Sequence, residues 1–343
     1  MKSRPIAILG IGLVTSLGLT AAACCCAFRA KITNPFETSF IDSSGAWIMA
    51  HQVNLDRPWS GLTKLAKMAA LAIEEALQNL NENQWHRLPL LLCVAEAERP
   101  GRLAGLDDQL LTQIQNELGV SFAPASAVVA QGRVGVAVAL AQARTLLGSA
   151  TPLGVLVVST DSLLSWPTLS HYEREDRLLT EANSNGFMPG EGAGALWVGA
   201  DVNRLHQMLC TGIGFGREPA HIASGEPLRA DGLTQAIKAS LDDAGRQLHD
   251  MDFRITDNSG EQYYFKEASL ALSRTLRQRK ETFDIWHPAE CTGEAGATSG
   301  VAVIAAASEA CLKDYAPGRN ILNHWANDAG QRAAVTLEYR VAA

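Results

Sequence analysis

The hydrophobic and polar positions along the chain form two kinds of pattern, short apolar runs and longer runs with helical spacing. Four short runs rich in valine, leucine and isoleucine predict buried strands, at residues 5–12, 88–95, 127–130 and 153–159. Residues 62–80 and 107–118 repeat apolar side chains every three or four positions, and residues 134–147 form an alanine-rich run, which predicts helices. This alternation indicates a parallel or mixed sheet covered by helices on both faces.

The second half of the chain repeats this alternation without obvious sequence repetition. Strands are predicted at residues 210–216 and 253–256, a helix at 233–244, and the segment 320–337 closes the sheet. A buried helix is predicted at residues 301–307, directly after a glycine-rich turn that contains Glu294. Glu294 is therefore expected at the start of that helix, where free N–H groups favour a carboxylate. We predict two intimately packed halves, residues 1–200 and 201–343.

The first residues of the chain allow two interpretations. Basic residues followed by an apolar run to Leu19 and by Thr20-Ala-Ala-Ala-Cys24 mimic a secretory signal peptide with a lipoprotein cleavage site. The competing interpretation is a buried strand, a turn, and a helix capped by Thr20. Gly10 and Gly12 interrupt the apolar run and favour the strand.

Composition and charge exclude several classes of partner. The chain has 343 residues, 47% of them hydrophobic, which is enough to bury a large core. Its formal net charge of −7 argues against nucleic acid or an anionic membrane surface as a partner. Beyond the N-terminus, no apolar run approaches the roughly 18 residues of a membrane span.

No metal or cofactor is predicted. The seven cysteines include three in a row and no C-x-x-C pair, so neither zinc nor a disulfide framework is indicated, and a reducing cytoplasm is expected. Gly10 and Gly12 form a G-x-G, but Thr15 stands where a dinucleotide fingerprint needs its third glycine.

Three glycine-rich motifs carry a family resemblance. They are Gly10, Gly12 and Gly18 near the N-terminus, G-F-M-P-G-E-G-A-G at 186–194, and T-G-E-A-G-A-T-S-G at 292–300. Together they resemble the ketosynthase branch of the thiolase superfamily. The resemblance implies a five-layered α/β/α/β/α fold with two pseudo-repeated halves, a dimer, and an acyl carrier protein or coenzyme A thioester as the substrate.

The same resemblance implies that the family's catalytic residues are replaced. The family's cysteine falls on Gln131 or Gly132, and its two histidines fall on Asp257 and Glu294. A glutamine in place of the cysteine is similar to the chain-length-factor partners of polyketide ketosynthases. Further pocket-lining candidates are Arg133, Ser259, Glu261, His287 and Asn327.

These replacements disfavour thioester condensation, which needs a thiolate and two imidazoles that stabilise an enolate. Ionised Asp257 and Glu294 would repel that enolate. One alternative is that these two carboxyl groups face one cavity and share a proton, with His287 and Glu290 completing a metal set, although H-P-A-E is not a recognised ligand spacing. The simpler interpretation is a scaffold whose buried polar groups are satisfied by backbone N–H groups and Arg133.

Longer motifs at 161–169, 183–191 and 286–294 resemble a group of ketosynthase-like proteins that lie in bacterial type VI secretion clusters. This resemblance implies an accessory protein that binds a secretion adaptor or effector. Two alternatives remain: an acyltransferase with a relocated nucleophile, for which Ser126 and Ser259 are the nearest candidates, and a chain-length-factor-like subunit that needs an active ketosynthase partner.

Overall fold

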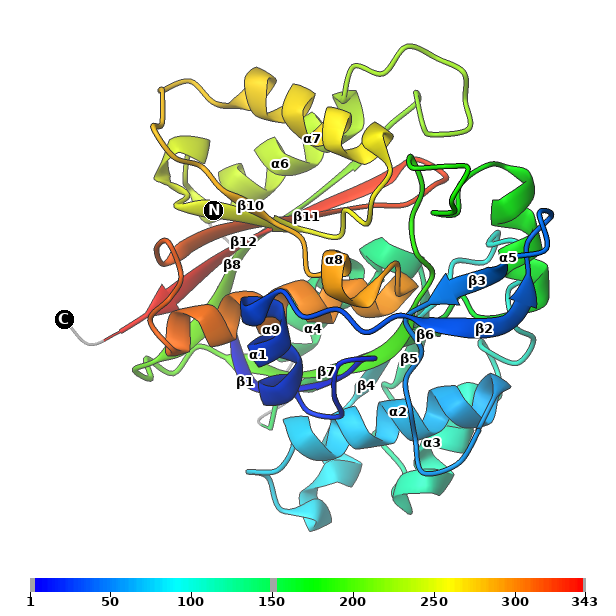
Figure 1. The fold of residues 1–343 in the computed structure, drawn as a ribbon. Coiled ribbons are helices and arrows are strands. Elements are labelled where there is room, and N and C mark those ends of the chain that lie inside the picture. The colour runs from blue at the N-terminus through cyan, green and yellow to red at the C-terminus, as the bar shows by residue number, and fades with distance from the viewer. Residues whose placement is uncertain (1–3, 149–152, 342–343) are drawn as a thin grey trace.

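The computed structural model describes residues 4–148 and 153–341 (Figure 1). Within these residues, ten strands form one sheet in the order β10-β9-β11-β12-β8-β1-β7-β6-β4-β5. Five strands come from the first half: β1 Ile6–Val14, β4 Leu90–Val94, β5 Ala127–Ala130, β6 Val155–Ser162 and β7 Glu191–Ala200. Five come from the second half: β8 Gln207–Arg217, β9 Phe253–Thr256, β10 Ile285–Trp286, β11 Asn320–Ala326 and β12 Gln331–Arg340. The strands β2 Phe36–Ile41 and β3 Trp47–Ala50 form a separate hairpin.

The two halves follow the same path through the sheet. In the first, β4 pairs in parallel with β5 and β6, and β7 runs antiparallel to both β6 and β1. In the second, β9 pairs in parallel with β10 and β11, and β12 runs antiparallel to both β11 and β8. The halves join where Ile6 and Ala7 of β1 pair with Cys210 and Leu209 of β8. This shared topology confirms the predicted pseudo-repeated halves.

Helices complete the layers around the sheet. The described helices are α1 Ala21–Ala30, α2 Gly61–Ala76, α3 Leu110–Leu118, α4 Gly135–Gly148, α5 Trp166–Arg174, α6 Asp231–Ala244, α7 Gln262–Thr275, α8 Ala289–Thr292 and α9 Ser299–Leu312. On the outside, α2 packs on the first half and carries α3, while α6 packs on the second half and carries α7 (Figure 1). Between the halves, α4 and α9 touch strands of both. The arrangement is the predicted five-layered α/β/α/β/α fold.

The middle layer depends on small side chains. Residues 299–307 of α9 are buried all round, which explains why this segment lacks an amphipathic pattern. A side chain at Gly300 would overlap Val136 of α4, so glycine lets the two central helices approach closely.

Several element boundaries differ from the sequence-based expectations. The helix predicted at 62–80 ends at Ala76, and the one predicted at 107–118 begins only at Leu110. The N-terminal segment forms a strand and then a helix, and the Thr20 hydroxyl accepts a hydrogen bond from the Ala23 N–H at 3.3 Å. The helix that follows Glu294 begins at Ser299, so the prediction that Glu294 opens this helix is wrong. A short 3-10 turn, Gly296–Thr298, lies between them.

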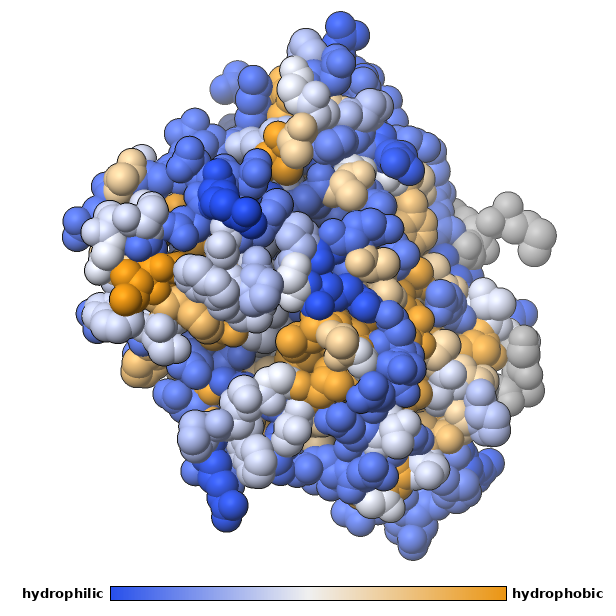
Figure 2. Space-filling model, turned by 90° about the vertical axis from the view of Figure 1, so that its right-hand side faces the viewer, coloured by the Kyte–Doolittle hydropathy of each residue, from blue (hydrophilic) through white to orange (hydrophobic). Residues whose placement is uncertain are grey.

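The surface seen in Figure 2, on the side of α5 and the β2–β3 hairpin, carries apolar patches separated by hydrophilic side chains. The exposed apolar side chains of these elements include Ile41, Trp47 and Trp166. In residues 4–148 and 153–341, no helix is long and apolar enough to cross a membrane.

Candidate functional site

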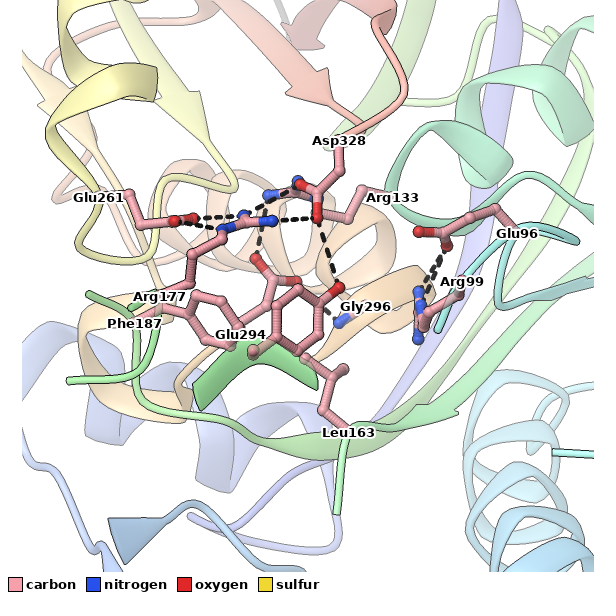
Figure 3. Close-up of a pocket in the computed structure, with 11 residues that line it drawn as sticks. Glu96, Arg99, Arg133, Leu163, Arg177, Phe187, Glu261, Glu294, Gly296 and Asp328 are labelled. Atoms are coloured by element: carbon pink, nitrogen blue, oxygen red, sulfur yellow. Dashed lines mark hydrogen bonds and ion pairs between the residues drawn. The ribbon is translucent and has the colours of Figure 1, made fainter. Parts of the chain in front are cut away.

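Charged side chains from both halves gather in the interior, where the turns after several strands meet. We call the following six residues the buried charge cluster, in which Arg177 and Asp328 are half-buried and the others buried: Arg133, Arg177, Asp257, Glu261, Glu294 and Asp328. Figure 3 shows all of them except Asp257. Arg133 follows β5, Asp257 follows β9, and Asp328 lies in the turn between β11 and β12. Arg177 follows α5, Glu261 caps α7, and Glu294 lies between α8 and α9.

Arg133 is at the centre of this cluster and is buried. Its Nη1 donates to Glu294 Oε2 at 3.1 Å and its Nη2 donates to Asp328 Oδ1 at 2.6 Å. Its Nε lies 3.9 Å from Asp257 Oδ2. The guanidinium also stacks over the Tyr264 ring, 4.7 Å from its centroid. One cation therefore contacts three carboxylates that lie far apart in the sequence.

Arg177 and Asp328 form a second set of ion pairs in the cluster. Arg177 makes a bidentate pair with Glu261, at 2.7 and 2.8 Å, and its Nη1 donates to Asp328 Oδ2 at 2.6 Å. Asp328 Oδ1 also accepts a hydrogen bond from the Tyr264 hydroxyl at 2.5 Å. Although burial alone would raise the pKa of Asp328, Arg133 and Arg177 hold it below its usual range. Asp328 is thus ionised and forms ion pairs with both arginines.

The pKa values of Glu294 and Asp257 are shifted upward, opposite to that of Asp328. Burial raises the pKa of Glu294 to about 7, against the lowering effect of Arg133. Burial also raises the pKa of Asp257, again against Arg133. Glu294 Oε1 accepts the Gly296 N–H at 2.9 Å, and its Oε2 accepts the Ser259 hydroxyl at 3.1 Å. Glu294 therefore interacts with the N–H of the 3-10 turn in place of the expected helix N-terminus.

A second ionic set adjoins the cluster and fills the turn after β5. Arg99 Nη1 donates to both oxygens of Asp161 at 2.7 Å, and its Nη2 donates to Glu96 at 2.7 Å. Gly132, which has a φ of +50°, lies against this set, and a Cβ there would overlap Glu96 Oε2. The turn that carries Gly132 therefore has no room for a side chain in the present packing.

Little free space remains among these groups. The cavity between Arg99, Arg133, Arg177 and the facing carboxylates has a volume of about 10 Å³. That volume holds about one water molecule and leaves no room for an acyl chain. The protein's own side chains fill the interior site.

The structure brings some of the predicted site residues together and separates others. Ser259, Glu261, Arg133, Asp257 and Glu294 lie in or against the buried charge cluster. The Gln131 side chain is exposed, and only its backbone oxygen contacts the interior, accepting from Asn327 Nδ2 at 2.8 Å. Asn327 braces that turn and does not line the cavity.

His287 lies elsewhere, in a groove lined by Phe28, Trp286, His287 and Tyr315, which we call the Trp286 groove. Its neighbour Glu290 lines the same groove. Within the described ranges, no group of three or more histidine, cysteine, aspartate or glutamate side chains is arranged to hold a metal ion.

Sequence reasoning missed Arg99, Glu96, Asp161, Tyr264, Arg177 and Asp328 as parts of the site. Weak signals were available for two of them. Asp328 lies in the N-D-A-G turn at 327–330, which follows an apolar run, and Asp161 comes two residues after the apolar strand predicted at 153–159. A charged residue beside an apolar run is a sign of a site in the sequence, but it does not identify the residue with which that charge pairs.

Comparison with known proteins identifies the fold. No protein-family model matches the sequence, and the search of curated proteins finds no match. Solved structures do match. One is a type II polyketide acyl carrier protein in complex with its ketosynthase bound to the hexaketide, with a TM-score of 0.81 and 14% identity over 98% of this chain and 100% of that chain. Another is the ishigamide ketosynthase/chain length factor, with a TM-score of 0.78 and 18% identity over 98% and 99% of the two chains.

A third is a β-ketoacyl synthase from Burkholderia phymatum STM815, with a TM-score of 0.72 and 14% identity over the whole of both chains. The chain has the thiolase-like fold of ketosynthases and chain length factors. At these identities, the likeness shows the fold alone.

Proposed function

We propose that this protein is a non-condensing subunit with a ketosynthase fold, which acts by binding another protein and carries no acyl chain. The observation that supports this proposal is the buried charge cluster. It fills the interior with paired charges and leaves about 10 Å³ free. A condensing enzyme would need space there for a thioester, together with a thiol and two imidazoles, and none of the six residues of the cluster supplies a thiol or an imidazole.

The side chains that could replace a catalytic cysteine are engaged in structural contacts. Ser126 Oγ donates to the Ala123 carbonyl at 2.6 Å and accepts the Leu90 N–H at 2.9 Å, so it closes a turn. Ser259 donates to Glu294. Cys93 lies against Gly135 at the start of α4, and burial raises the pKa of its thiol, which keeps it protonated. These contacts disfavour the acyltransferase alternative.

The open edge of β5 supports a protein partner. β5 is the last strand of the sheet and pairs only with β4 among the described strands. It is short and apolar, and Ala127 is exposed. An apolar edge strand with free backbone groups is a template for pairing with another chain. We propose that its occupant is a second chain with the same fold that retains the cysteine, as for a chain length factor, with a homodimer as the competing state.

A native mass measurement tests this proposal. The chain alone has a mass of 36.7 kDa, and it would be measured alone and after co-expression with a cysteine-bearing ketosynthase from the same organism. We expect a one-to-one heterodimer. Ala127→Lys should disrupt it by placing a charge on the β5 edge, whereas Ala200→Lys, which changes an exposed alanine at the end of β7, should not. A heterodimer that survives Ala127→Lys, or no heterodimer, would overturn the proposed partner.

Intact mass after incubation with acyl-coenzyme A and acyl carrier protein tests the non-condensing part separately. We expect no covalent adduct, and a stoichiometric acyl adduct on one side chain would refute this part.

The second candidate partner is a secretion adaptor or effector in the cytoplasm. It is favoured by the sequence motifs at 161–169, 183–191 and 286–294, which resemble ketosynthase-like proteins of type VI secretion clusters. Co-expression with a type VI secretion adaptor from the same organism, in the same native-mass experiment, distinguishes the two partners. A complex with the adaptor and none with the ketosynthase would favour the adaptor.

A further inference from the structure

The Trp286 groove is a separate open cavity of about 200 Å³. Its floor is formed by the buried side chains of Phe28 from α1, Ile255 from β9 and Ala306 from α9. One wall is aromatic, because the Trp286 and Tyr315 rings lie nearly parallel, at 18°, with centroids 6.3 Å apart. An apolar body placed in this groove would be removed from water on several sides.

The rim of the groove carries an excess of positive charge. The Arg29 side chain is exposed, and its guanidinium lies 4.5 Å from the Tyr315 ring centroid. Lys31 forms an ion pair with Glu290 at the same rim. Among the residues that line the groove, two cations, Arg29 and Lys31, stand against one carboxylate, Glu290. A single anionic group would neutralise this excess charge.

His287 adds an unused hydrogen-bonding group. Its Nδ1 is buried without a hydrogen-bond partner and lies 3.7 Å from Glu290 Oε2, which is too long for a hydrogen bond. A buried polar nitrogen without a partner is uncommon in a folded protein.

We propose that the Trp286 groove binds a small amphipathic carboxylate. Its apolar body lies against Trp286 and Tyr315, and its carboxylate lies between Arg29 and Lys31. At about 30 Å³ of liquid volume per water molecule, the groove holds on the order of seven non-hydrogen atoms, so the end of a longer ligand extends through its open side. The net charge of the rim favours a monoanionic carboxylate over a dianionic phosphate ester. This site is distinct from the buried charge cluster and does not depend on the proposed partner.

Isothermal titration calorimetry with matched probes tests the proposal. Octanoate and 3-phenylpropionate represent a linear and a flat body with the same charged group, and 1-octanol has the linear body without the charge. We expect at least one carboxylate to bind, and octanol to bind at least tenfold more weakly than octanoate. Raising the salt concentration should weaken the binding of the carboxylate and leave the binding of octanol unchanged. Failure of both carboxylates to bind, or equal binding of octanol, would overturn the proposal.

Variants locate the site. Arg29→Gln and Lys31→Gln should each weaken carboxylate binding at least fivefold. Arg57→Gln, on an exposed arginine outside the groove, should leave the affinity unchanged. Glu290→Gln should tighten binding, because it removes the competing carboxylate from Lys31. Ala306→Leu should abolish binding by filling the floor. If Ala306→Leu fails to fold, the exposed rim variants decide the question. Unchanged affinity in both rim variants would refute the assignment.

Discussion

The buried charge cluster and the Trp286 groove share one segment of chain and differ in how their charges are satisfied. Within residues 286–294, Trp286, His287 and Glu290 line the groove, whereas Glu294 joins the cluster. In the cluster, both arginines are held by carboxylates of the protein, and about 10 Å³ is free. In the groove, about 200 Å³ is open, and the His287 Nδ1 has no hydrogen-bond partner. The interior site is closed by its own ion pairs, while the surface groove has charges left for a ligand.

This difference has an energetic consequence. The charged groups of a buried ion pair have lost their hydration, and only the partner compensates for that loss. Removing one partner therefore leaves a buried charge without compensation and destabilises the fold. Exposed ion pairs such as Lys31–Glu290 contribute little to stability. Substitutions in the cluster should therefore be detected as changes in folding, and substitutions in the groove as changes in binding.

The largest effect is expected for Arg133→Met. The variant leaves Glu294, Asp328 and Asp257 without their shared cation, so the free energy of unfolding should fall by about 3–5 kcal/mol. Urea denaturation followed by circular dichroism measures this change. Arg57→Met, on an exposed side chain, is the matched control. A loss below about 1 kcal/mol would mean that the cluster does not hold the interior closed.

The second prediction concerns pH and Glu294. Its pKa is raised from 4.5 to about 7 in the folded state, so the folded state binds a proton that the unfolded state releases between these values. This group's contribution to stability therefore decreases as the pH rises from about 4.5 to about 7, by on the order of 2–3 kcal/mol. Glu294→Gln removes the contribution.

The difference between wild-type and variant must be measured across this pH range. Burial lowers the pKa of His51 to about 4 and that of His324 to about 3, and these groups change the stability of both proteins in the opposite direction. We expect the stability of the wild type relative to Glu294→Gln to fall steadily as the pH rises. Glu74→Gln, on an exposed carboxylate of α2, is the control. A difference that does not vary with pH would show that the pKa of Glu294 is not raised on folding.

The third prediction restores a thiol to the turn after β5. Gly132→Cys must accommodate a positive φ and an overlap with Glu96, so it should destabilise the fold by about 1–3 kcal/mol and gain no acyl loading. Gly119→Cys is the matched control, because Gly119 also has a positive φ, of +66°, but a Cβ there would meet no atom within 4 Å. Urea denaturation and intact mass after incubation with acyl-coenzyme A measure the two effects. Equal losses in the two variants, or an acyl adduct on the introduced thiol, would show that this turn has room for the chemistry.

The fold could be predicted from the sequence much further than the site. Apolar runs and helical spacing are local signals, and they place strands such as residues 127–130 and 253–256 within their observed limits. The site depends on contacts between residues that are distant in sequence, such as Arg133 with Asp328 and Arg177 with Glu261. Gln131 illustrates the difficulty: the sequence places it in the turn after β5, but the turn directs its side chain to the solvent. No local pattern distinguishes an inward from an outward orientation there.

The smallest effect on stability is expected for Lys31→Gln, and this variant separates the two regions most sharply. Lys31 is exposed and pairs with Glu290 at the rim of the Trp286 groove, so its loss should change the free energy of unfolding by less than about 0.5 kcal/mol. The same change should weaken octanoate binding at least fivefold, because Lys31 is one of two rim cations. Urea denaturation and calorimetry on one preparation measure both quantities. If Lys31→Gln lowers the free energy of unfolding but leaves the octanoate affinity unchanged, the Lys31–Glu290 pair has a structural role like the pairs of the cluster. The contrast between the two regions would then be wrong.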